Sequence, residues 1–338
     1  MLSSITMGLV VVILLALTFE FINGFHDTAN SIATSVSTRV LTPTIAIIMT
    51  ATMNFAGALA SDKVAKTISK GLVNGSVEQY VIVAALLAAI IWNLITWYFG
   101  IPSSSSHALI GGLVGASLVY AMDISKVIWN DGEGGGVVGK VVIPLFASPV
   151  IGLIAGLTIM SFLYWILQGC SNILVNRWFS KFQILSAALM AYSHGNNDAQ
   201  KTMGIITLAL VNAGVLSQDS GIPWEVKILC AAVMAAGTSM GGWKIIKTMG
   251  TKLTKLQPVG GFAAETAAAL VIEGASHFGA PVSTTHVIST AIMGVGASKR
   301  LSAVKWVLAK NIVWAWVLTI PITSTLGALI TLAIKQFV

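Results

Sequence analysis

Two clusters of hydroxyl side chains interrupt an otherwise apolar sequence. They are "PSSSSH" at 102–107 and "PVSTTH" at 281–286. Proline favours the first turn of a helix or the bend before it, so each cluster is predicted to begin a helix. A helix start offers free N–H groups and a partial positive charge, which suit an anion. The two clusters therefore predict an anion site built from hydroxyl and backbone donors.

Each cluster also has a structural interpretation. Serine and threonine hydroxyls cap membrane helices, or bond to the carbonyls of the preceding turn. Capping explains one cluster as well as an anion site does. The recurrence of the same arrangement in both halves of the chain favours a shared ligand.

Two aspartates stand in a second pair of matching motifs, "NGFHDTAN" at 23–30 and "HGNNDAQK" at 194–201. A carboxylate in an apolar segment is costly and marks a functional site. Carboxylate and amide oxygens are suitable ligands for a hard cation. The candidate ligands in these motifs are Asp27, Asn23, Asn30, Asn196 and Asp198. The alternative places each aspartate at a helix end, in the interfacial region of the membrane.

The charges of these motifs indicate how the two ligands depend on each other. Two carboxylates and a bound dianion would bring about four negative charges together, and each unpaired buried charge costs several kcal/mol. Lys201 is the only basic side chain in the motifs, apart from histidines. Cations that bind with the anion would supply the missing charge, and each ligand would then raise the affinity of the other. This is the physical basis of symport.

Four histidines lie in the motifs: His26, His107, His194 and His286. Their spacing matches no zinc motif, and we expect His107 and His286 to hydrogen-bond to neighbouring hydroxyls or carbonyls. A proton-relay role stays open because the unperturbed pKa of histidine is about 6.5. Three acidic residues in apolar segments are secondary candidates for contact with a cation: Glu20, Glu265 and Glu273.

The elements that position these motifs are membrane helices. Of the 338 residues, 56% are hydrophobic and only 9% are charged, whereas a soluble domain has about 25% charged residues. Uncharged stretches long enough to cross a bilayer lie at 1–19, 40–61, 79–101, 141–169 and 311–334. An all-α integral membrane protein follows, because lipid-exposed backbone must bond to itself. The net charge of +7 fits basic loops at a membrane surface and indicates no nucleic acid partner.

The motifs divide the chain into two similar halves. We predict a first membrane repeat at 1–122, a polar loop and connecting membrane segment at 123–180, and a second membrane repeat at 181–338. Internal repeats are typical of secondary transporters, whose sites lie at the repeat interface on helices broken by glycine or proline.

At these motifs the chain resembles the PiT-type inorganic phosphate transporter family, through "GFHDTAN", "GNNDAQK", "PSSSSH", "PVSTTH" and "GGFAAETAAA". The resemblance covers most of the chain. It implies about twelve helical segments in two inverted repeats, with broken helices or re-entrant hairpins. The partners that it implies are a second copy of the chain and the lipid bilayer. It also implies a multi-pass protein of the cell (inner) membrane that imports inorganic phosphate, without a cofactor, by symport with sodium ions as co-substrate.

The resemblance also assigns residues to the two ligands. The phosphate ligands would be Ser104, Ser105, Ser106, Ser283, Thr284 and Thr285. The cation ligands would be Asp27, Asn23, Asn30, Asn196, Asn197 and Asp198. The chain departs from the family pattern at His26, and at Gln200 and Lys201, which replace cation ligands. Symport with protons, or of a metal-phosphate complex, therefore remains an alternative to sodium symport.

Two other functions compete with phosphate transport. Sulfate is a possible cargo, but hydrogen phosphate carries a proton that Asp27 or Asp198 could accept, and this favours phosphate. An intramembrane serine hydrolase is suggested by the neighbouring Ser106 and His107. Adjacent residues on a helix do not face each other, so they form a poor nucleophile–base pair, and we expect a transporter and no enzyme.

Overall fold

The computed structural model describes residues 7–70, 72, 77–130, 132, 135–217 and 219–337. Within these residues, the α-helices of the first half are α1 (Met7–Ser37), α2 (Pro43–Ala58), α3 (Lys63–Lys70), α4 (Gln79–Phe99), α5 (Ser105–Ala121) and α6 (Ile143–Ile166). Those of the second half are α7 (Asn172–Asn212), α8 (Trp224–Thr238), α9 (Trp243–Lys247), α10 (Pro258–His277), α11 (Thr284–Lys299) and α12 (Trp306–Lys335). Short 3₁₀ or π segments are η2 (Ile124–Lys126), η3 (Val138–Val142), η4 (Thr248–Leu253) and η5 (Leu301–Ala303).

Four of the described helical segments are long and apolar enough to cross a membrane: Met7–Ser37, Gln79–Phe99, Val138–Ile166 and Trp306–Lys335. They coincide with four of the apolar stretches predicted from the sequence, although residues 1–6 of the first stretch lie outside the described residues. The fifth predicted stretch, 40–61, contains α2. The prediction of an all-α membrane protein with about twelve helical segments is confirmed.

Two further pairs of helices form broken apolar segments. The axis bends by 65° between α2 and α3, and by 63° between α8 and the segment Trp243–Leu253. Each bent pair follows the helix that carries an aspartate motif, so the breaks occur at matching places in the two halves. The expected broken helices are therefore present.

Two tight turns place the hydroxyl clusters. Gly100 follows α4 and Gly279 follows α10, and each has φ of +66°. A side chain is strained in this left-handed conformation, whereas glycine adopts it readily. Each glycine ends its helix, and the proline two residues later keeps the chain extended until the next helix begins. The matching glycines thus set the starting points of α5 and α11.

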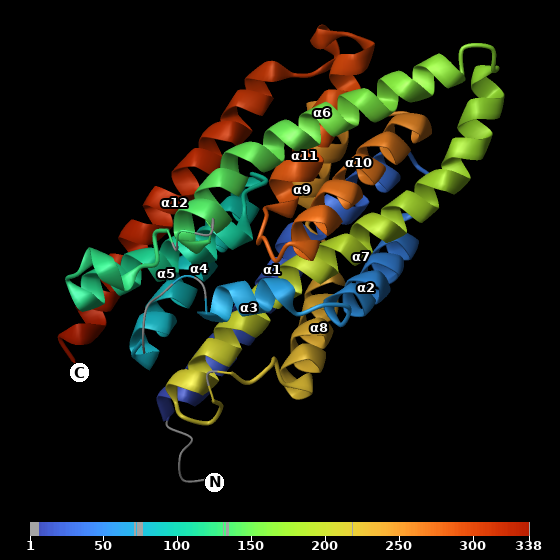
Figure 1. The fold of residues 1–338 in the computed structure, drawn as a ribbon. Helices are drawn as coiled ribbons and strands as arrows, with labels where there is room; N and C mark the ends of the chain where they lie inside the picture. Colours follow the sequence, from blue (N-terminus) through green and yellow to red (C-terminus); the bar gives the residue numbers. More distant parts are fainter. Residues whose placement is uncertain are drawn as a thin grey trace.

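Helices from opposite halves of the sequence pack on one another in a matched pattern. The helix α5 packs on α12 and α11 packs on α6, while α1 packs on α8 and α7 packs on α2. Figure 1 shows the long helix α7 beside α2, with α8 next to both. Because the two aspartate motifs lie on α1 and α7, which are also in contact, this packing brings the motifs together.

Glycines allow the helices that carry the aspartates to approach their neighbours closely. A Cβ atom at Gly24 would lie 2.5 Å from the Met234 carbonyl oxygen and 3.0 Å from Gly237 Cα. A Cβ atom at Gly195 would lie 2.6 Å from Asn54 Cα. Small residues at helix contacts are a common means of association in membranes, because they let backbones pack directly.

We therefore expect Gly24→Ala to destabilise the protein. The added methyl group meets backbone atoms of α8 that cannot rotate away, and overpacking of this kind costs about 1–3 kcal/mol. Thermal unfolding of the purified protein in detergent should show a lower midpoint than for the wild type. Gly274→Ala in α10 is the control, because a Cβ atom there meets nothing within 4 Å. Equal losses for the two variants would contradict this account of the α1–α8 contact.

Candidate functional site

Both hydroxyl clusters begin a helix, as predicted. Ser104 is the N-cap of α5 and its hydroxyl accepts a hydrogen bond from the His107 backbone N–H at 3.2 Å. Ser283 is the N-cap of α11 and accepts from the His286 N–H, also at 3.2 Å. The next two hydroxyls of each cluster lie in the first turn, where N–H groups lack intrahelical partners.

The first turn of α11 contacts both aspartates. The Thr284 hydroxyl donates to Asp198 Oδ2 at 2.8 Å, and the Thr285 hydroxyl donates to Asp27 Oδ1 at 3.4 Å. The Asn30 side-chain amide donates to the same two hydroxyls, at 3.2 and 2.9 Å. The structure thus joins residues of three separate motifs.

Histidine and hydroxyl groups hold the Asp27 carboxylate. His26 Nδ1 lies 2.6 Å from Asp27 Oδ1, and His26 Nε2 lies 3.1 Å from the Thr96 hydroxyl. The Ser103 hydroxyl donates to that of Thr96 at 2.8 Å. Thr96 and Ser103 were not among the sequence-based candidates, although Ser103 belongs to the first hydroxyl cluster. They act through His26, which they help to orient.

The Asp198 carboxylate is bound by a lysine. Lys201 Nζ contacts Asp198 Oδ1 and the Ser106 hydroxyl, and it donates to the Val282 carbonyl oxygen at 3.0 Å. His194 Nε2 lies 3.1 Å from Asp198 Oδ2. The sequence identified Lys201 as the one basic side chain of the motifs apart from histidines and as a departure from a family pattern. In the structure its amine connects α7 to α5 and to the turn before α11.

We call these residues the central cluster: Asp27, Asn30, Ser106, Asp198, Lys201, Thr284 and Thr285. The cluster is closed to solvent, since Asp27 is only 3% exposed and Asp198 only 1%. One ligand atom from each of Asp27, His194 and Asp198 lies within 4.8 Å of the others. This spacing is short enough for one cation to contact the three groups.

Buried oxygens near Asp27 fit a cation. The side-chain oxygens of Asn23 and Asn30 are buried, and neither accepts a hydrogen bond within the described residues. An unpaired buried carbonyl is costly unless a donor or a cation satisfies it. The Asp27 side therefore offers amide and carboxylate oxygens, the ligand type that hard cations prefer.

Asn196 and Asn197 make other contacts. The Asn196 amide donates to Glu273 at 3.1 Å, and that of Asn197 donates to the Ser276 hydroxyl at 2.8 Å. Gln200 donates to the Asn196 side-chain oxygen at 3.0 Å. These contacts attach the start of the second motif to α10, and the structure does not bring the two asparagine amides into the central cluster.

The buried glutamates have neutral partners. Thr202 donates to Glu20, while Glu265 accepts from Thr34, from Ser186 at 2.5 Å and from Gln183 at 3.2 Å. Both glutamates are fully buried. Their hydrogen bonds link α1 to α7 and α10, outside the central cluster.

The histidines that follow the hydroxyl clusters lie against each other. The rings of His107 and His286 have centroids 4.9 Å apart, and the His286 ring stacks on Trp316 at 4.0 Å. Neither ring nitrogen of His286 has a partner within the described residues. The expectation of hydrogen bonds from the His286 ring was wrong, because aromatic packing positions this side chain.

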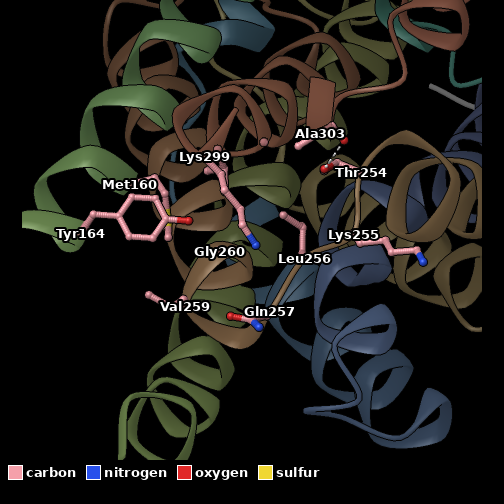
Figure 2. Close-up of a pocket in the computed structure, with 12 residues that line it drawn as sticks. Met160, Tyr164, Thr254, Lys255, Leu256, Gln257, Val259, Gly260, Lys299 and Ala303 are labelled. Atoms are coloured by element: carbon pink, nitrogen blue, oxygen red, sulfur yellow. Dashed lines mark hydrogen bonds between the residues drawn. The ribbon is translucent and has the colours of Figure 1, made fainter. Parts of the chain in front are cut away.

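A surface pocket elsewhere contains two lysines but no residue of the aspartate motifs or the hydroxyl clusters. Lys255, Gln257 and Lys299 are among its lining residues. Figure 2 shows that the amines of Lys255 and Lys299 end on different sides of Leu256, so they do not converge on one point. The buried central cluster is therefore the stronger candidate site.

Known proteins resemble this chain throughout its length. The sequence model of the phosphate transporter family matches residues 23–174 and 168–327. A probable low-affinity inorganic phosphate transporter of Bacillus subtilis is 49% identical over 330 residues, which cover 95% of each chain. A protein of Rhizobium meliloti with the same description is 47% identical, again over 95% of each chain. A solved structure described as the sodium-dependent phosphate transporter matches with a TM-score of 0.84 and 25% identity, over 98% of this chain and 100% of the other.

The apolar helices, the broken segments and the buried polar cluster define a multi-pass membrane transporter. The comparisons specify it further: the chain belongs to the phosphate transporter family, and it is an inorganic phosphate transporter. The serine-hydrolase alternative is wrong, because the relatives are transporters and not enzymes.

The Asp198–Lys201 pair leads to a stability prediction. Asp198→Asn leaves the Lys201 ammonium buried without its carboxylate, and breaking a buried ion pair in this way costs about 3–5 kcal/mol. The variant should unfold at a clearly lower temperature than the wild type in detergent. Asp219→Asn is the matched control, since Asp219 is exposed and its partner at 3.9 Å, Lys70, is 51% exposed, and exposed pairs contribute only about 0–1 kcal/mol. A midpoint for Asp198→Asn no lower than that of the control would contradict the buried pair.

Proposed function

We propose that this chain imports inorganic phosphate by symport with sodium across the cell (inner) membrane. One observation carries the proposal: the hydroxyl-lined start of α11 contacts two buried carboxylates, and the hydroxyl-lined start of α5, from the other half, reaches one of them through Lys201. The helix starts suit an anion, and the carboxylates suit cations. The solved structure similar to this chain is described as sodium-dependent, which supports the choice of sodium.

Phosphate would bind to the hydroxyls of both helix starts: Ser104, Ser105, Ser106, Ser283, Thr284 and Thr285. The hydroxyls of Ser104 and Ser283 accept backbone hydrogen bonds in their caps, and a hydroxyl that accepts still has one hydrogen to donate. The Ser105 hydroxyl is buried and has no partner within the described residues. These groups supply donors without fixed charge.

Hydrogen bonds to the aspartates couple phosphate to sodium. Thr284 and Thr285 direct their single hydrogens to Asp198 and Asp27, so these hydrogens are not available to an anion. A sodium ion at Asp27 would take over part of the charge that the Thr285 hydroxyl now stabilises. The hydroxyl would then turn to phosphate, and the phosphate charge would in turn hold the ion.

The sodium ligands would be Asp27, Asn23 and Asn30, with Asp198 as the second carboxylate of the site. The Asn197 side-chain oxygen is buried without a donor within the described residues and would be a further ligand, whereas the Asn196 oxygen would first have to give up its hydrogen bond from Gln200. The ions enter and leave with phosphate, so they are co-substrates, and the proposed transport needs no cofactor.

The histidines favour proton coupling as a second candidate. His26 and His194 lie 2.6 and 3.1 Å from the carboxylates of Asp27 and Asp198, and histidine exchanges protons near neutral pH. The spacing of Asp27, His194 and Asp198 also suits a divalent ion carried as metal-phosphate. Both alternatives use the same phosphate ligands.

The two halves of the transporter are proposed to be inverted repeats that alternate around the central cluster. The family matches at 23–174 and 168–327 overlap near residue 170, which supports a division of the chain there. The predicted boundaries at 122 and 180 instead set α6 apart as a connecting segment. A division near 170 would pair α6 with α12, and α6 packs on α11 as α12 packs on α5. A homodimer in the bilayer remains part of the proposal.

Phosphate uptake into proteoliposomes tests the coupling. With an inward sodium gradient and equal pH on both sides, labelled phosphate should accumulate above its external concentration. With a proton gradient and no sodium, uptake should stay at the level of protein-free liposomes. Accumulation that follows the proton gradient and ignores sodium would overturn the sodium proposal in favour of the second candidate.

We expect Thr285→Val to weaken phosphate binding in the presence of sodium by about tenfold or more, because a hydrogen bond to a charged group contributes about 1.5–3 kcal/mol. The half-saturating phosphate concentration of uptake reports this change. Thr325→Val is the control: the Thr325 hydroxyl is exposed and donates to the Pro321 carbonyl oxygen of its own helix. An unchanged phosphate dependence in Thr285→Val would remove Thr285 from the site.

A further inference from the structure

Asn30 and Lys201 occupy the same position in the two aspartate motifs. Each lies three residues after its aspartate, on α1 and α7 respectively. Residues at this spacing share one face of a helix, so both side chains extend along the aspartate toward the hydroxyl clusters. The Asn30 amide reaches Thr284 and Thr285. The longer Lys201 side chain brings a positive charge to the corresponding place beside Asp198.

Oxygen atoms surround that charge. Lys201 Nζ contacts a carboxylate oxygen of Asp198, the hydroxyl of Ser106 and the carbonyl of Val282, and the residue is only 2% exposed. Carboxylate, hydroxyl and carbonyl oxygens are also the groups that bind a hard cation. An ammonium group is a compact point charge, and it can replace such an ion in this environment.

We propose that the Lys201 ammonium acts as a tethered cation, which occupies the cation position of the second half and leaves only the Asp27 side for a mobile sodium ion. This inference rests on the proposed sodium symport. It assigns one fixed and one exchangeable positive charge to the two aspartates.

The Asp27 side differs in the way that this proposal requires. The side-chain oxygens of Asn23 and Asn30 are buried without a donor within the described residues, and both hydrogen bonds to Asp27 go to Oδ1. On the Asp198 side the Asn197 side-chain oxygen is likewise buried without a donor within the described residues, but Lys201 binds Asp198 Oδ1, and Thr284 and His194 approach Oδ2. Ligand oxygens thus remain available beside Asp27, whereas both oxygens of Asp198 are engaged.

Direct binding of phosphate by Lys201 is a competing role. A lysine ammonium has three hydrogens to donate, and Lys201 has three oxygen partners, on Asp198, Ser106 and Val282. No hydrogen is then left for an anion. The positive charge of Lys201 still offsets the negative charge of the phosphate bound nearby. Unlike a sodium ion, this charge stays on the protein during transport.

Lys201→Asn tests the tethered cation, because it gives the second half the residue found in the first. Equilibrium dialysis with labelled sodium and saturating phosphate should show one more bound sodium ion per chain than in the wild type. Thermal unfolding should change in parallel: sodium, compared with choline, should raise the midpoint of Lys201→Asn more than that of the wild type, because the added ion binds only the folded state. Lys66→Asn is the control, since it removes a lysine–aspartate pair on the protein surface and should leave the number of bound ions unchanged.

The outcomes separate the possible roles of Lys201. A Lys201→Asn protein that binds phosphate about tenfold more weakly, with an unchanged number of sodium ions and unchanged sodium stabilisation, would overturn the tethered cation and identify Lys201 as a phosphate ligand. A wild-type protein that binds no sodium would instead refute sodium symport. In that case the variant Lys201→Ala decides the role of Lys201.

Lys201→Ala keeps the proposal testable in both situations, including a failure of Lys201→Asn to fold. The shortened side chain leaves space for a small cation, so methylammonium should restore phosphate binding by about tenfold relative to choline, the change expected for one charged hydrogen bond. Methylammonium should have no such effect on the wild type or on Lys66→Asn. Absence of any gain in Lys201→Ala would overturn the proposal.

Discussion

The structure depends on the burial of two carboxylates, Asp27 and Asp198, in the interior of a membrane protein. Burial of an uncompensated carboxylate costs several kcal/mol, and the protein offsets this cost with donors from both halves. Threonine hydroxyls at the start of α11 reach both carboxylates, and Lys201 neutralises one of them. The other carboxylate has the Thr285 hydroxyl and the His26 ring as its neighbours and no lysine, which makes it the more suitable place for an exchangeable cation.

The packing of the helices serves this cluster. Glycines on α1 and α7 allow backbone contact with α8 and α2, so the aspartate helices are held from both sides without bulky side chains. The left-handed glycines before Pro102 and Pro281 end α4 and α10, and α5 and α11 start where their hydroxyls can contact residues of α1 and α7. The closely packed glycines and the left-handed glycines before proline occur in both halves, whereas the residues after the aspartates differ. The asymmetry of the site therefore lies in a few side chains and not in the arrangement of the helices.

Much of the fold and part of the site were predictable because they follow from local chemistry. Low charge content and long apolar stretches determine membrane helices, and a proline followed by hydroxyls determines a helix start. The same rules did not reveal Thr96 and Ser103. The sequence does not show that His26 lies between the Thr96 hydroxyl and Asp27, or that Ser103 bonds to Thr96. They also failed for His286, whose ring packs on Trp316 of the following helix, α12.

The membrane class, the two pairs of motifs and the chemical types of their ligands can be read from the sequence, since these depend on composition and short spacings. Which motif residues meet depends on the packing of the helices. The tertiary structure separates Asn196 and Asn197 from the central cluster by bonding them to α10, and it places Lys201 between Asp198 and Ser106. The physical reason is that such contacts join residues far apart in the chain, and their geometry is set by how the helices pack.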